Sequence, residues 1–90
     1  MYLFQPCSMT EGAKQKKILN DKIAIRIKFL REQIEPIQSK FADNNMIDRQ
    51  ILSRWESTTD KRGLSIHTIS KFCKMINISL QDFFDDELFH

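Results

Sequence analysis

Hydrophobic residues recur at helical spacing along most of this chain. The first stripe has spacings of four, three and four, and consists of Ile23, Ile27, Leu30 and Ile34. This spacing predicts one side of a helix that Asn20 or Asp21 can cap. Pro36 ends the helix, because its ring removes an amide hydrogen and disfavours helical geometry in the preceding residue. A second helix is predicted from Ile37 to Asn44, with Phe41 and Ala42 buried.

A polar break separates this second helix from a third. The break consists of Asp43, Asn44 and Asn45, and Asn tolerates left-handed backbone better than other residues with a side chain, so a tight turn is expected there. Asp48 is placed to cap a helix from Arg49 to about Glu56. Its apolar members are Ile51, Leu52 and Trp55, and its exposed remainder is Arg49, Gln50, Ser53 and Arg54.

Two further helices are predicted after a loop at residues 57–63. Ser65 caps a helix whose apolar stripe is Ile66, Ile69, Phe72, Cys73 and Ile76, and Asn77 stops it. Ser79 then caps a last short helix that carries Leu80, Phe83 and Phe84. Because no segment alternates with period two, the predicted fold is all-α with five helices at residues 21–90. Residues 1–20 lack clean periodicity and are predicted to form a flexible basic N-terminal arm.

The size and charge of the chain restrict its function. Ninety residues with 41% hydrophobic positions and seven Phe suffice for one domain with a modest core, and leave little volume for a deep catalytic cleft. The formal charge of +2 hides an uneven distribution. All fourteen Lys and Arg lie between Lys14 and Lys74 among seven acids, which gives that stretch +7, whereas four acids crowd the C-terminus. A basic body suits a polyanionic partner.

No residue pattern typical of an enzyme or a metal protein is present. Cys7 and Cys73 stand far apart, without Cys or His spaced as a zinc ligand set, and His67 and His90 have no partners at the spacing of a catalytic triad. We therefore expect no enzyme activity, no metal and no cofactor. The chain also lacks an export leader and an 18-residue apolar run, so a cytoplasmic protein without a membrane span is expected.

The third predicted helix has the chemistry of major-groove reading. Two short helices joined by a tight turn place the N-terminus of the second in the groove of double-stranded DNA. Arg can donate to guanine O6 and N7, and Gln can pair with adenine. Arg49 and Gln50 lie at that N-terminus, and Ser53 and Arg54 follow one turn later on the same side. For Arg54, an intramolecular ion pair is the chief alternative.

The sequence resembles the Cro and phage-repressor-like helix-turn-helix family, also called the XRE family, over residues 21–84. The segment from Gln38 to Ala42 is similar to the family's second helix, and Arg31 precedes Gln38 by the family's seven positions. Ala42 precedes Glu56 by the family's fourteen positions, with Ser53 to Glu56 resembling a common end of the recognition helix. Departures are Ile37 in place of a capping residue, and Asn45 and Met46 in place of a large apolar residue and Gly.

The resemblance implies a lambda-repressor-like fold and a role for each matching residue. Gln38 is expected to clamp a phosphate, and Ser57, Thr59 and Lys61 to contact the DNA backbone. The bases are expected to meet Arg49, Gln50, Ser53 and Arg54. Arg31 and Glu56 are expected to form a structural ion pair, which also suits an Arg after an apolar stripe and a Glu after a buried Trp.

Two functions are therefore open from the sequence. The first is a sequence-specific transcriptional regulator, and the second is a protein-interaction module of the same fold, such as an antitoxin-like partner of a toxin. Four apolar residues near the C-terminus exceed what a small core easily buries, namely Phe83, Phe84, Leu88 and Phe89. They predict a self-association patch and hence a homodimer.

Overall fold

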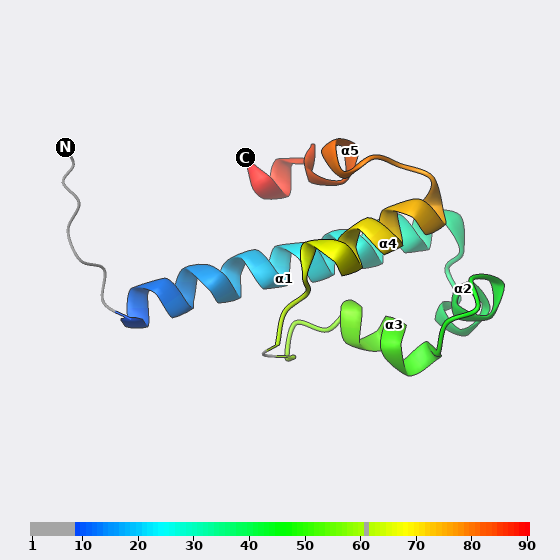
Figure 1. Ribbon diagram of the computed structural model, residues 1–90, viewed down its shortest axis with the longest axis horizontal. Helices are drawn as coiled ribbons and strands as arrows, with labels where there is room; N and C mark the ends of the chain where they lie inside the picture. The colour runs from blue at the N-terminus through cyan, green and yellow to red at the C-terminus, as the bar shows by residue number, and fades with distance from the viewer. Residues whose placement is uncertain (1–8, 61) are drawn as a thin grey trace.

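The computed structural model describes residues 9–60 and 62–90, and every regular element among them is a helix (Figure 1). The elements are α1 (Met9–Ile34), α2 (Gln38–Asn44), α3 (Arg49–Trp55), α4 (Ile66–Ile76), α5 (Leu80–Phe84) and the 3-10 helix η1 (Glu87–Phe89). The predicted all-α class with five α-helices is confirmed. Within this part of the chain, no helix combines the length and the apolar character needed to cross a membrane.

Short polar residues begin three of the helices, as predicted. The Asp48 carboxylate accepts from the Gln50 amide at 2.8 Å, and the Ser79 hydroxyl accepts from the Asp82 amide at 3.0 Å. Ser65 caps α4 in the same way. Each cap satisfies an amide that the first turn of a helix leaves without an internal partner. Asn77 ends α4 in the left-handed region, with φ 62°.

The first helix begins at Met9 rather than at Asp21, which corrects the predicted flexible arm over residues 9–20. At about 1.5 Å per residue, its 26 residues span about 39 Å, and its first turns project beyond α3 and α4 (Figure 1). Lys, Gln and Ala favour helix without any apolar stripe. Periodicity therefore gave no signal for these turns. The rest of the predicted arm, residues 1–8, lies outside the described residues.

The core forms around Phe72 on α4. This ring is fully buried and lies 6.1 Å from Phe41 of α2, 6.4 Å from Trp55 of α3 and 6.3 Å from Phe83 of α5, measured between ring centroids. The other buried apolar residues are Ile23, Ala24, Ile27, Ala42, Leu52, Ile69 and Cys73. Burial raises the pKa of the Cys73 thiol, as expected for a small core residue. One residue of α4 thus joins three other helices.

The aromatic residues of the predicted self-association patch pack against one another. Phe83 is fully buried, and the half-buried Phe84 and Phe89 lie at centroid distances of 4.9 and 6.3 Å from it. The buried Arg26 of α1 holds this segment by donating to the Phe83 carbonyl oxygen at 2.8 Å and to the Asp86 carboxylate at 3.2 Å. The rings that looked excessive in the sequence therefore extend the core.

The turn between α2 and α3 contains one residue with left-handed backbone, and it is Met46 rather than an Asn. Met46 has φ 58° and is 94% exposed. Asn45 keeps a negative φ, and its side-chain amide donates to the Phe41 carbonyl oxygen at 2.9 Å. Left-handed geometry costs an L-residue about 1–2 kcal/mol, because Cβ crowds the carbonyl oxygen. Met46 is therefore a strained residue that makes little contact in return.

Replacing this residue by glycine is expected to stabilise the protein. Met46→Gly removes the steric cost and loses almost no packing, although glycine also gains freedom in the unfolded chain. The net gain is about 0.5–1 kcal/mol. Urea denaturation measures it, with Asn44→Gly as the control, because Asn44 is the last helical residue of α2 and that change should destabilise. An unchanged or lower stability of Met46→Gly would contradict the strain.

Candidate nucleic-acid interface

The second and third helices pack against each other and are joined by a short turn. The Ile47 amide donates to the Ala42 carbonyl oxygen at 3.0 Å, and the Met46 amide donates to the Asp43 carbonyl oxygen at 3.2 Å. These bonds close the turn directly onto the end of α2. Figure 1 shows α3 on the opposite side of α1 from α5 and the C-terminus. The acidic C-terminal segment therefore does not cover α3.

The two sides of α3 differ sharply in burial. Leu52 and Trp55 are buried in the core, whereas Arg49, Gln50 and Ser53 are exposed. The structure thus brings three of the four predicted base-contacting residues together on one accessible face, at the first turns of the helix. Ile51, an apolar member of the predicted helix, is 45% exposed beside them.

The fourth predicted residue, Arg54, lies in the alternative arrangement that its sequence context left open. Its Nη1 atom is 3.7 Å from Oδ2 of Asp60, and its side chain is 32% exposed. Arg62 also pairs with this carboxylate, with Nη2 at 3.1 Å from the same oxygen. The hydrogen bond from the Arg62 side chain lowers the pKa of Asp60, and the Arg62 amide and the charge of Arg54 lower it further.

These groups surround a shallow hollow of about 620 Å³ between α3 and the loop that follows it. Its lining is mainly polar and includes both acidic and basic side chains. The lining residues are Asp48, Gln50, Ile51, Ser53, Arg54, Ser57, Thr59, Asp60 and Arg62. The hollow is open, which suits a ligand that lies along the surface rather than one enclosed by it. Within the described residues, no cluster of three or more His, Cys, Asp or Glu side chains could hold a metal ion.

The predicted ion pair between Arg31 and Glu56 is present and nearly dry. Arg31 Nε lies 2.8 Å from Oε2, Nη2 lies 2.9 Å from Oε1, and the two side chains are 3% and 4% exposed. Arg31 Nη1 donates to the carbonyl oxygens of Glu35 and Pro36 at 3.1 and 2.7 Å. The hydrogen-bonded carboxylate raises the pKa of Arg31. The pair fastens the end of α3 to α1 and to the corner before α2.

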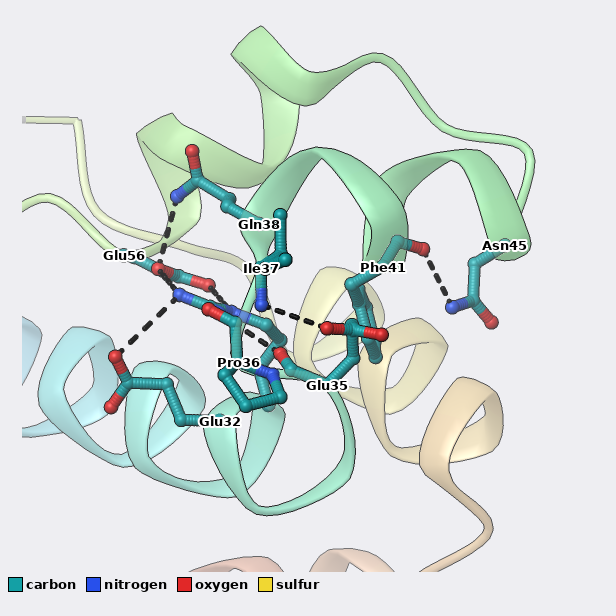
Figure 2. Close-up of polar contacts among 9 residues, drawn as sticks. Glu32, Glu35, Pro36, Ile37, Gln38, Phe41, Asn45 and Glu56 are labelled. Atoms are coloured by element: carbon teal, nitrogen blue, oxygen red, sulfur yellow. Dashed lines mark hydrogen bonds and ion pairs between the residues drawn. The ribbon is translucent and has the colours of Figure 1, made fainter.

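The predicted phosphate clamp, Gln38, takes part in the same network. Figure 2 shows its side chain directed at Glu56, where Nε2 donates to Oε1 at 3.1 Å. In the same view Ile37, which lacks a capping side chain, donates its amide to the Glu35 carboxylate at 2.9 Å. One hydrogen of the Gln38 amide is used by Glu56, so the second stays available for a ligand.

The other predicted backbone contacts lie in the loop after α3. Ser57 is half-buried and Thr59 exposed, and the Ser57 hydroxyl accepts from the Thr59 amide at 3.1 Å. Lys61 lies outside the described residues. The loop therefore carries two hydroxyl groups at the edge of the hollow, on the same side as the exposed face of α3.

Sequence reasoning missed two charged residues of this surface. Asp60 and Arg62 form a local turn in which the Arg62 amide donates to the Asp60 carboxylate at 2.8 Å. The signal was an Asp two residues before an amide that it can accept from, which is how Asp stabilises loops. The pairing of Asp60 with Arg54 had no such signal, because it joins the loop to the helix before it.

Comparison of the chain with protein-family models, with curated protein sequences and with solved structures found no match.

Proposed function

We propose that this protein is a sequence-specific regulator that binds double-stranded DNA, with α3 in the major groove of a lambda-repressor-like five-helix domain. The observation that carries the proposal is the division of α3 into a buried apolar side and an exposed side with Arg49, Gln50 and Ser53 at the helix N-terminus. Long donors on the first turns of a short helix after a tight turn are what base reading requires.

The surroundings of α3 support a phosphate-binding frame. The second amide hydrogen of Gln38 and the guanidinium of Arg62 can donate to phosphate oxygens on either side of the helix. The hydroxyls of Ser57 and Thr59 are bonded to each other at 2.9 Å, which leaves one hydroxyl hydrogen of the pair to donate as well. Arg54 joins them by exchanging the Asp60 carboxylate for a phosphate or a base. Such contacts position the protein, and the exposed residues of α3 supply the specificity.

A protein partner is the second candidate, and Ile51 is the observation that favours it. Its side chain is 45% exposed amid polar groups, and burying that apolar surface would stabilise a protein complex. In DNA the same side chain has a ready partner in the thymine methyl group. Ile51→Ala separates the two, because it should weaken DNA binding only at sites containing that thymine, whereas it should weaken a protein complex as a whole.

Selection of binding sites from random duplexes tests the DNA proposal, followed by affinity measurements on the recovered site. Arg49→Ala and Gln50→Ala are each expected to lose about 1–3 kcal/mol of binding free energy, or roughly 5- to 150-fold in affinity, because each removes a side-chain contact with a base. The loss should fall on the selected site and leave binding to unrelated DNA almost unchanged.

Lys71→Ala is the matched control, since it removes an exposed charge from α4 rather than from α3. The logarithm of the affinity should also fall with the logarithm of salt by about 0.9 per phosphate neutralised. The proposal is wrong if no motif is recovered, or if both α3 variants bind the selected site as tightly as the unchanged protein.

A further inference from the structure

The outer face of α1 carries a row of large apolar side chains that no helix covers in the described structure. Ile18, Ile25 and Phe29 are 54%, 47% and 51% exposed. At 3.6 residues per turn they lie within about 40° of one another, on the side opposite the buried Ile23 and Ile27. We refer to these three residues as the α1 stripe. Single exposed apolar residues are ordinary, but a row on one helix face indicates an interface.

A hollow beside the stripe deepens this surface. Ile25, Arg26, Phe29, Asp86 and Leu88 line a space of about 250 Å³ between α1 and the C-terminal segment, and its lining is mainly apolar. A large side chain from outside can therefore insert there. Because Phe83, Phe84 and Phe89 are occupied with one another, the apolar surface available for association is on α1 rather than at the C-terminal rings.

The charges at the two ends of the stripe identify the occupant. Lys14 precedes Ile18 by one helical turn, and Glu32 follows Phe29 by about one turn, so both lie on the same face and both are exposed. A second α1 running in the opposite direction places Ile18 against Phe29 of the other copy. The same register brings Lys14 of each copy beside Glu32 of the other. The face is thus complementary to itself only in an antiparallel pair.

We infer that the protein forms a homodimer through the α1 stripe, with the two α1 helices antiparallel. The stripe faces neither α5, which Arg26 contacts, nor the end of α3, which Arg31 contacts. The two-fold axis of an antiparallel pair is perpendicular to the plane of the two helices, so both α3 helices stay on one side of the dimer. The use of this arrangement on a palindromic DNA site rests on the proposed function, whereas the dimer itself does not depend on it.

Sedimentation equilibrium of the free protein tests the inference, with circular dichroism to verify folding. The unchanged protein should show twice the chain mass of 10.7 kDa, and Phe29→Glu and Ile25→Glu should show a single chain mass at the same concentration. Both positions are exposed, so these variants should fold. Ile34→Glu, equally exposed at 57% but outside the stripe, should remain dimeric.

A charge exchange tests the orientation. Lys14→Glu and Glu32→Lys should each weaken the dimer roughly tenfold, because two attractive pairs become repulsive in each case. A mixture of these two variants should form a heterodimer about as stable as the original dimer, since every Glu then meets a Lys. The inference is overturned if the unchanged protein is monomeric, if Phe29→Glu still dimerises normally, or if the mixture forms no heterodimer.

Discussion

Removing one partner of the buried ion pair is expected to cost more stability than any change on the protein surface. Arg31→Met leaves the Glu56 carboxylate without the two hydrogen bonds that hold it at 2.8 and 2.9 Å, in a place where it is 4% exposed. An unpaired buried charge of this kind costs about 3–5 kcal/mol. Because the free energy of unfolding of a native protein is only about 5–15 kcal/mol, the variant should be close to unfolded. Urea denaturation followed by circular dichroism measures the loss.

The double variant Arg31→Met, Glu56→Leu is the control for this prediction. Apolar residues of similar size remove both charges together, so most of the lost stability should return. The carbonyl oxygens of Glu35 and Pro36 still lose their donor, and a remaining loss of about 1–2 kcal/mol is expected from them. A single variant that loses less than about 1 kcal/mol would show that the pair is not the fastening that its geometry indicates.

Truncating the central aromatic residue is the second change with a large expected effect. Phe72→Ala removes a fully buried ring that lies within 6.1–6.4 Å of the rings of Phe41, Trp55 and Phe83. The lost burial and the cavity together cost about 3–5 kcal/mol. The edge-to-face contacts with Trp55 and Phe83 are lost as well. Equilibrium urea unfolding, monitored by Trp55 fluorescence, measures this change.

Phe72→Leu is the matched variant, since it keeps most of the volume without the ring. Its loss should be nearer 1–1.5 kcal/mol. The dependence of the free energy of unfolding on urea should keep its slope in both variants if the fold is retained. Equal losses for Ala and Leu would mean that the neighbouring rings collapse into the space, and that Phe72 does not join the helices.

Features set by neighbouring residues could be predicted from the sequence. Pro36 lies two residues after the end of α1 at Ile34, as the loss of its amide hydrogen predicts. Asp48, Ser65 and Ser79 each cap the helix that follows, because a cap needs only a side-chain oxygen a few residues before a backbone amide. The pairing of Arg31 with Glu56 was also predicted, although through resemblance rather than spacing. The exposed face of α3 followed from its periodicity.

Features that depend on distant residues could not be predicted in this way. Arg26 is buried where it donates to two carbonyl oxygens more than fifty positions later in the chain, and its neighbours in α1 give no sign of this burial. The C-terminal rings pack on one another, and a count of apolar residues could not predict these contacts. The two Asn residues of the polar break indicated a turn with left-handed backbone, but that geometry falls on Met46, and the Asn45 side chain donates to the Phe41 carbonyl oxygen instead.

The separation of the two sides of α3 has a consequence for how this protein can change over time. Leu52 and Trp55 are committed to the core, and Glu56 holds both Arg31 and Gln38, so substitutions there disturb the whole molecule. Arg49, Gln50 and Ser53 have no such commitments among the described contacts. Their identities can be exchanged with little thermodynamic penalty, which makes this helix a suitable starting scaffold for directed evolution of new recognition preferences.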